Sequence, residues 1–341
     1  MTFIPPRCPY PECILHRTPE DGFFCRKGSY RPKCRPHPVP RFRCNGCLRT
    51  FSRQSFRMDY RDHRPDLNPR LAALLSSGLG LRQTARLLHL SPRCLELKFR
   101  KVARHLHLLH RSLRAHARLE NPSFLLDEME TFETERSTGS LTIPVVIHER
   151  SMFVIAADCG PIPPSGTMTA SRRARIQAKA RANGRRPNRS RQVVRRVLAR
   201  AACLCQGTPQ VYLGTDQKKT YPRLAREAFG KERLVLQQHS SKLPRTSRNP
   251  LFRINLTNAI LRDLNGRLRR RSWLVSKKRY FLRLQLALAT CYRNYQRKRF
   301  NRDHRTPGMV LGIVKEPLSW EQMLSDRQDW GRRNIDVRAT A

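Results

Sequence analysis

Residues 125–128 read Leu-Leu-Asp-Glu, and residues 211–216 read Val-Tyr-Leu-Gly-Thr-Asp. Each is a short apolar run that ends on an acid, in a chain that is poor in acids. Such runs are typical of buried strands. Two further strand-like runs, at 141–148 and 151–158, predict a hairpin between the acidic segments. The pattern therefore predicts an α/β sheet with an acid at two of its strand ends.

These two acids, Asp127 and Asp216, suit metal-dependent chemistry on phosphodiesters. Phosphodiester cleavage uses divalent metals roughly 3.5–4 Å apart, held by carboxylates that converge from different strands. One strand-end Asp is a weak signal, because caps and turns use Asp freely. The two together favour a site for Mg²⁺ or Mn²⁺ at Asp127 and Asp216.

Closely spaced cysteines open the chain, at Cys8, Cys13, Cys44 and Cys47. Each pair can bind one tetrahedral Zn²⁺ through two thiolates, and two such pairs complete a four-cysteine site. Residues 1–60 are too polar to form a core alone, so the ion would supply folding energy. The sequence predicts a zinc ribbon here. Alternative ligands left open by the spacing are Cys25, Cys34, His16 and His37.

The charge of the chain predicts a polyanionic partner. Lys and Arg number 69 against 25 Asp and Glu, which gives a formal net charge of +44. Self-repulsion on this scale destabilises a compact state, and the charge runs through the whole chain rather than a tail. Nucleic acid is the expected partner. Without a signal peptide or the roughly 18 apolar residues of a membrane span, we expect a cytoplasmic protein with no membrane partner and reduced cysteines.

Residues 66–118 carry helical periodicity. Gly78 and Gly80 end one helix, and Ser91 with Pro92 begins another as N-cap and first helical residue. A short helix, a tight turn and a basic third helix predict a helix-turn-helix whose last helix enters a major groove. The alternative is an ordinary three-helix bundle with a solvated basic face. The predicted DNA contacts of this helix are Arg93, Lys98, Arg100, Lys101 and Arg104.

The remaining segments are a basic insertion and a C-terminal region. Residues 165–200 are strongly basic, with Gly184 and Pro187 between two possible helices, and predict either a DNA-contacting insertion or a disordered loop. The tail, 301–341, contains a short helix that begins at Ser319 with a capping-box pattern. Helical spacing predicts burial of Ile254, Leu261, Leu264, Leu268, Leu284, Leu288, Cys291 and Tyr295.

A family resemblance appears at residues 253–258, Arg-Ile-Asn-Leu-Thr-Asn, and at the Arg-rich segment 267–277 that follows. These motifs, the acidic motifs at 127–128 and 215–216, and the order of the parts resemble DDE-type transposases of small bacterial insertion sequences of the first-described type. The resemblance extends from Cys8 to about Tyr295 and leaves the basic insertion unexplained.

The resemblance implies a multidomain α+β architecture. Its parts would be a zinc ribbon over 1–60, a helix-turn-helix domain over 66–118, an RNase H-like α/β catalytic core over 122–300, and the tail. It implies a DNA transposase that binds the element's terminal repeats and uses Mg²⁺ or Mn²⁺ to cleave DNA and transfer strands to target DNA. The implied setting is the bacterial nucleoid, with a homodimer or a higher assembly on double-stranded DNA.

The third acidic residue of the family is the point of departure. In a gapless match it falls on Asn255, which can offer a carbonyl oxygen to a metal but removes one negative charge; Asn255 as a helix cap is the alternative. Asp263 could serve only in another register. Asn258, Arg262 and Arg269 are expected to contact the phosphate backbone from the same helical face. An active variant, a metal-weakened enzyme and a DNA-binding remnant all remain open.

Overall fold

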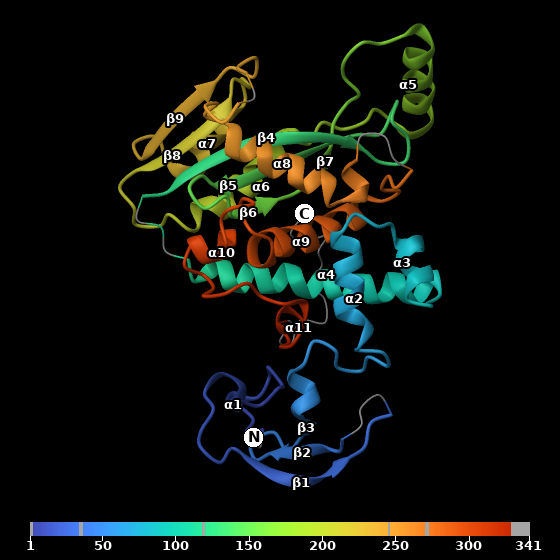
Figure 1. Ribbon diagram of the computed structural model, residues 1–341, viewed down its shortest axis with the longest axis vertical. Helices are drawn as coiled ribbons and strands as arrows, with labels where there is room; N and C mark the ends of the chain where they lie inside the picture. The colour runs from blue at the N-terminus through green and yellow to red at the C-terminus, as the bar shows by residue number, and fades with distance from the viewer. Residues whose placement is uncertain are drawn as a thin grey trace.

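The computed structural model describes residues 3–33, 37–117, 119, 121–244, 246–269 and 273–328. Over these ranges the chain is a mixed α/β protein with two sheets (Figure 1). A small N-terminal unit lies at one end, and helices with the larger sheet form the rest. No helix in the described ranges is long and apolar enough to cross a membrane. Cys34 and residues 329–341 lie outside them.

The N-terminal unit is built on a three-stranded antiparallel sheet. Its elements are α1 (Ile14–Arg17), β1 (Phe24–Tyr30), β2 (Val39–Cys44), β3 (Thr50–Ser52) and a 3₁₀ turn (Arg53–Phe56). Phe42 packs on Phe51 with 5.7 Å between ring centroids, and Phe23 and Phe56 extend this aromatic layer. A core of this size rarely folds without a metal or a covalent staple.

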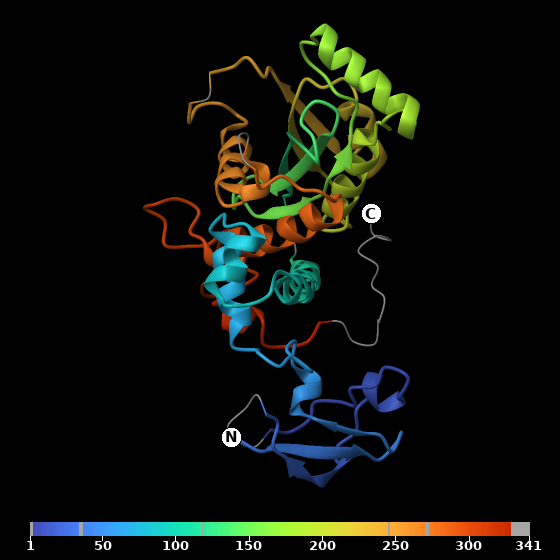
Figure 2. The same cartoon turned by 90° about the vertical axis from the view of Figure 1, so that its right-hand side faces the viewer.

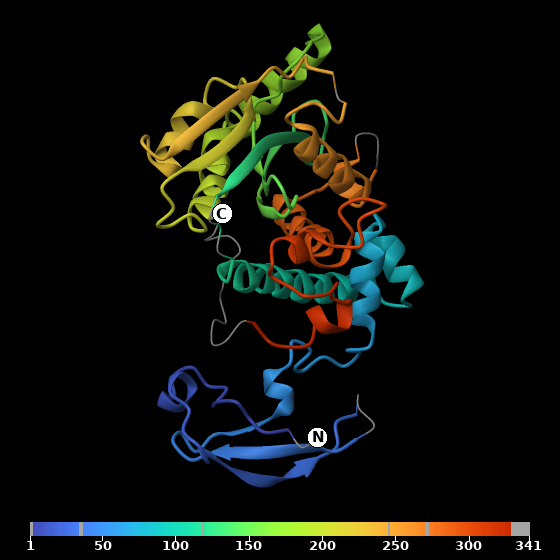
Figure 3. The ribbon, with the colours of Figure 1, turned by 60° about the vertical axis from the view of Figure 1, so that its left-hand side comes forward.

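Three helices lie where the sequence predicts them: α2 (Leu67–Ser76), α3 (Leu81–Leu87) and α4 (Pro92–Ala115). The hydroxyl of Ser91 accepts the backbone N–H of Cys94 at 3.2 Å, which confirms the predicted N-cap. The long helix α4 lies between the N-terminal unit and the larger sheet (Figure 3). One face of α4 is buried, at Leu95, Phe99, Val102 and Leu106.

The larger sheet has the strand order β6-β5-β4-β8-β9, with β7 paired to β5. Its strands are β4 (Ser123–Phe132), β5 (Ser140–His148), β6 (Val154–Ala157), β7 (Gly160–Pro161), β8 (Val211–Asp216) and β9 (Leu234–His239). The pairs β4–β5 and β5–β6 are antiparallel, whereas β4–β8 and β8–β9 are parallel. The hairpin predicted from the sequence is therefore confirmed, and β4 is the central strand of a mixed sheet.

Helices cover both faces of this sheet. They are α6 (Ser190–Ala202), α7 (Tyr221–Phe229), α8 (Phe252–Asp263) and α9 (Arg279–Cys291). Phe124 and Leu126 of β4 enter the core beside α4, α6 and α7, while Leu125 and Met129 enter the core beside α8. Because strand side chains alternate, each face of β4 is committed to one set of helices. All eight residues predicted to be buried are buried.

The basic stretch 165–200 divides into two helices with different roles. Helix α5 (Ala170–Asn183) has no buried residue and projects beyond the sheet (Figure 2). It is held at its base by ion pairs of Arg175 and Lys179 with Glu135. Helix α6 instead packs its valines against the sheet. The predicted insertion therefore ends before Ser190, because the second helix is part of the core.

The C-terminal region returns to α4. It contains a π turn (Tyr292–Gln296) and the short helices α10 (Pro307–Val310) and α11 (Trp320–Met323), and a 3₁₀ turn (Gly266–Leu268) precedes α9. The hydroxyl of Ser319 accepts the N–H of Gln322 at 3.2 Å, which confirms the predicted cap. Trp320 stacks on Tyr292, and His105 of α4 bonds the carbonyl of Met323 at 2.8 Å.

Candidate metal and nucleic-acid sites

The register of β4 and β8 brings the two predicted acids together. Leu125 pairs with Gly214 and Leu126 with Thr215 in a parallel ladder. The next step along both strands is Asp127 beside Asp216. Paired residues on neighbouring strands point to the same face, and the strands lie about 4.8 Å apart. Two carboxylates therefore share one face at the end of this strand pair.

The electrostatics of this pair favour a cation. Burial raises the pKa of Asp127 above its usual range, and the negative charge of Asp216 raises it further. Two donors oppose this shift without cancelling it: the N–H of Glu128 lies 2.8 Å from Oδ1, and the amide of Asn258 lies 2.8 Å from Oδ2. A buried carboxylate beside a second one is costly unless a positive charge is present.

Helix α8 brings Asn258, rather than the predicted Asn255, against Asp127. Asn258 is 6% exposed, and its Oδ1 has no hydrogen-bond partner among the described residues. Asn255 lies one turn earlier, half-buried, and its side chain forms no hydrogen bond with a described residue. Gly214 on β8 leaves room for the side chain of its β4 partner, because a Cβ there would lie 2.7 Å from Leu125. Two carboxylates and an orphaned amide oxygen are the hard ligands that Mg²⁺ prefers.

Glu128 turns to the opposite face of β4, away from the acid pair. It accepts hydrogen bonds from Lys218 at 2.5 Å, from Tyr221 at 2.9 Å and from Ser190 at 3.1 Å, and a fourth comes from Thr142. The sequence groups Glu128 with its neighbouring acid but gives no sign of these partners, which come from β5, α6, α7 and the β8–α7 loop. Glu128 is therefore a structural anchor.

Lys218 connects this anchor to the acid pair. Its backbone N–H donates to Oδ1 of Asp216 at 3.1 Å, while its ammonium binds Glu128. We expect Lys218→Met to lower the free energy of unfolding by about 2 kcal/mol, the value of a hydrogen bond to a charged group. Urea denaturation measures the change. Lys219→Met, an equal change at an exposed neighbour, is the control, and equal losses in both variants would contradict the role of the anchor.

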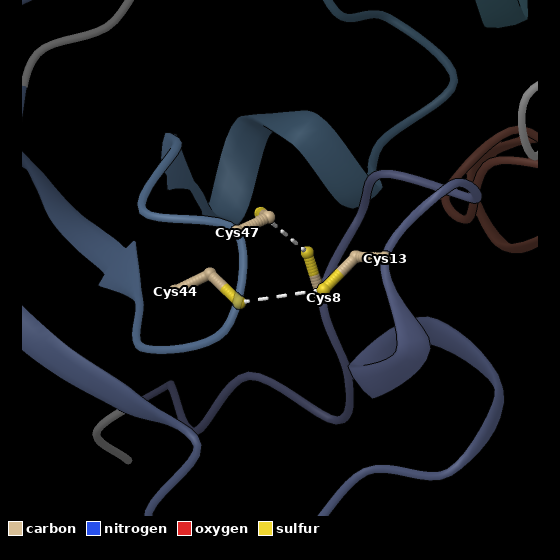
Figure 4. A group of neighbouring side chains, drawn as sticks. All are labelled: Cys8, Cys13, Cys44 and Cys47. Atoms are coloured by element: carbon tan, nitrogen blue, oxygen red, sulfur yellow. Dashed lines mark hydrogen bonds between the residues drawn. The ribbon is translucent and has the colours of Figure 1, made fainter.

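The four predicted cysteines form one cluster (Figure 4). Their sulfur atoms all lie within 4.8 Å of one another, with Cys8 3.7 Å from Cys47 and Cys13 3.8 Å from Cys44. A tetrahedral Zn²⁺ with bonds of about 2.3 Å separates its sulfurs by about 3.8 Å. Of the alternatives, Cys25 and His37 are exposed, and His16 bonds the carbonyl of Cys8 at 2.7 Å.

The surroundings of the sulfurs also suit a metal. Burial raises the pKa of Cys44, but the N–H groups of Cys47 and Gly46 outweigh this and lower it. Burial raises the pKa of Cys8 and of Cys47, so these thiols stay protonated unless a cation binds them. Gly46 fits the turn closely, because a Cβ there would lie 2.7 Å from Leu15. The cluster could hold a metal such as Zn²⁺.

The basic face predicted for α4 is largely covered. Lys98 is buried, with its ammonium 2.5 Å from Asp62 and 2.7 Å from the carbonyl of Arg64. Lys101 donates to the carbonyl of Tyr60 at 2.8 Å. Both lysines hold the segment before α2 against α4. The prediction of Lys98 as a DNA contact is wrong for this reason.

The arginines of α4 include both covered and exposed side chains. Arg100 pairs with Glu96 and lies over the ring of Phe281, 5.2 Å from its centroid. Arg100 and Arg104 both line a pocket that Tyr280 of α9 also lines. Arg93 is open, with a side chain that is 70% exposed. Exposed basic residues missed by the sequence interpretation are Arg82 and Arg86 on α3. Arg70 on α2 and Arg111 near the end of α4 are exposed as well, so the accessible basic residues of this segment are spread over all three helices.

Arg262 and Arg269, which were predicted on one helical face with Asn255, lie in different places. Arg262 donates to the carbonyl of Glu130 at 3.3 Å from the sheet side of α8. Arg269 lies beyond the end of that helix, exposed, and bonds the carbonyl of Asp263 at 3.2 Å. It therefore does not share the helical face on which it was predicted. The segment that follows presents Trp273, which is fully exposed.

Comparison with known proteins adds no assignment. No protein-family model and no curated protein matches this sequence. The acid pair, the cysteine cluster and the charge of the chain are therefore the features that indicate its function.

Proposed function

We propose that the chain is a DDE-type DNA transposase of an insertion sequence, which binds element ends and cleaves DNA with Mg²⁺ or Mn²⁺ at Asp127, Asp216 and Asn258. The observation that carries the proposal is the pair of acids on one sheet face with the buried amide of Asn258 against them. The strand order β6-β5-β4-β8-β9, with one acid on the central strand and one on its parallel neighbour, supports an RNase H-like core.

In this proposal the chain's own residues have separate tasks. Asp127 and Asp216 bind the cations, and Asn258 orients Asp127 through its amide. The cations, when bound, stabilise charge on the attacking and leaving oxygens of phosphodiester transfer. The net charge of +44 draws DNA to the protein, and the open arginines of α3 and α4 bind its phosphates as a helix-turn-helix would. The cysteine cluster, as a zinc ribbon, would stiffen the N-terminal unit.

A second candidate is a DNA-binding protein without nuclease activity, such as a repressor of related elements. The observation that favours it is the amide at the third position, because two carboxylates hold two dications less strongly than three. Both candidates predict tight binding that weakens steeply with salt. Only the first predicts metal-dependent nicking.

The test is nicking of the DNA that flanks the gene, in Mg²⁺ and in Mn²⁺. We expect wild type to nick, and Asn258→Asp to nick at least about tenfold faster at low metal, because a third carboxylate next to Asp127 adds charge where the cations bind. Asn255→Asp is the matched control on the same helix and should behave as wild type. A gain in Asn255→Asp alone would move the third position there. No nicking by any of them, with DNA binding intact, would leave the second candidate.

A further inference from the structure

A cavity of about 360 Å³ lies between α4, α6, α9 and the edge strand β6. Its wall includes Ile155, whose side chain belongs to the core beside α4 and α6, whereas Asp127 faces α8. The cavity is therefore separate from the acid pair. Its charged and titratable lining residues are His107, His110, Arg111, Arg114, Asp158, Arg200, Cys203 and Arg283.

The lining has more positive charge than its single acid can balance. Asp158 is already bound by two guanidinium groups, with Arg196 2.8 Å from Oδ2 and Arg283 3.0 Å from Oδ1. Arg111, Arg114 and Arg200 bring three further guanidinium groups to the same cavity. Asp158 is the only acid among the described residues that line it. A partly buried cluster of like charges is costly without an anion.

The titration behaviour of these groups has the same cause. Burial and the charge of Arg200 together lower the pKa of Arg114 to about 10. Burial and the neighbouring arginines lower the pKa of His107 to about 4 and that of His110 to about 3. Both imidazoles are therefore neutral at pH 7. The ring nitrogens of His110 already bond Tyr295 and the carbonyl of Ile155, so His107 is the imidazole that can bond a ligand without adding charge. A bound anion would reverse these shifts.

Hydrogen bonding to the edge strand β6 explains why some of these polar side chains lie in the cavity, but not all of them. His110 and Arg114 donate to the edge carbonyl of Ile155, at 3.2 and 2.6 Å, and so satisfy a strand that lacks a neighbour on that side. That role needs neither Arg111 nor Arg200, which come from one turn of α4 and from α6. Both arginines line the cavity together with Arg114.

We propose that this cavity binds the phosphate of a small phosphorylated molecule of nucleotide size. One guanidinium group can donate two parallel hydrogen bonds to the oxygens of a phosphate. Three arginines around one cavity can therefore bind several phosphate oxygens. The volume lies within the range of small-ligand pockets, about 300–1,000 Å³, and is far too small for a DNA duplex. The lining also includes Ala156, Leu284 and Ala287, whose apolar side chains suit a sugar or base.

The test is calorimetric titration of the full chain with inorganic pyrophosphate and with adenosine monophosphate at fixed ionic strength. A protein of +44 binds anions over its surface, so a matched control is essential. We expect one site whose affinity falls at least tenfold in Arg111→Gln and in Arg200→Gln. Arg191→Gln, at an exposed arginine of α6 outside the cavity, should stay within twofold of wild type. Equal losses in all three variants would overturn the proposal.

A second readout locates the ligand. Pyrophosphate should shift the imidazole nitrogen resonances of His107 and His110 in wild type and not in Arg111→Gln, whose exposed side chain can change without unfolding the protein. Absence of the shift in wild type would overturn the site. Competition separates the sources of phosphate. If a 5′-phosphorylated single strand displaces pyrophosphate while adenosine monophosphate does not, the small-molecule ligand is wrong and a strand end binds here.

Discussion

Replacement of Asp127 by Asn is expected to abolish metal-dependent nicking while raising the stability of the metal-free protein. The first effect should exceed about 100-fold, because even residues that only support metal ligands cost about 10- to 100-fold. The second follows from the environment of Asp127, whose pKa is raised by burial and by Asp216. Asparagine removes one of two neighbouring charges and keeps the shape. Nicking assays and thermal denaturation with and without Mg²⁺ measure both effects.

The contribution of Asp127 to folding stability changes with pH in one direction. The pKa of Asp127 is higher in the folded chain than in the unfolded chain, so its contribution to stability is present at low pH and is lost as pH rises through the folded value. Mg²⁺ competes with that proton. The rise in Tm caused by Mg²⁺ should therefore be larger at pH 8 than at pH 5 in wild type, and absent in Asp127→Asn.

A matched acid on α8 provides the control for this prediction. Asp263 is exposed and lies two turns from Asn255, so Asp263→Asn should leave both nicking and the Mg²⁺ response unchanged. Nicking that survives in Asp127→Asn would remove this residue from the chemistry. An Mg²⁺ response of the same size at both pH values would place the cation elsewhere.

Local patterns were sufficient for much of this fold. The apolar runs of β4 and β5 identify strands because a strand covered on both faces buries successive residues. Asp216 ends β8 as predicted, whereas Asp127 lies inside β4, which continues to Phe132, so its predicted position at a strand end is wrong. Ser91 before Pro92 marks the start of α4 because capping is decided by neighbouring residues. The cluster of four cysteines also follows from their spacing within two short turns.

Other features depend on packing between distant segments. The rotation of α8 about its axis selects Asn258 over Asn255, and that rotation is set by its contacts with β4, which no local pattern records. Lys98 lies on a basic helical face, yet a segment more than 30 residues earlier supplies Asp62 and covers it. The arginine-lined cavity collects side chains from α4, α6 and α9. Such sites cannot be predicted without the tertiary structure.

Removal of zinc is expected to unfold the N-terminal unit while leaving the larger sheet folded. Its core is a layer of four phenylalanines, each worth about 1.5–3 kcal/mol on burial, against a conformational entropy cost of about 1 kcal/mol or more for every ordered residue. A structural Zn²⁺ contributes about 10–16 kcal/mol in zinc-binding peptides. Elemental analysis should find one zinc per chain. A strong chelator should abolish the near-ultraviolet circular dichroism of the phenylalanines.

Two cysteine variants make this prediction specific to the cluster. Cys44→Ser should lose zinc and make residues 1–60 sensitive to protease, whereas Cys25→Ser, at an exposed cysteine outside the cluster, should keep both zinc and resistance. The part of the protein that contains the larger sheet should keep its Tm. The N-terminal unit meets it through individual hydrogen bonds, such as that from the N–H of Met58 to the carbonyl of Ser325 at 3.1 Å. Zinc retained in Cys44→Ser would contradict a four-cysteine site. Global unfolding in Cys44→Ser would instead make the N-terminal unit part of one cooperative core.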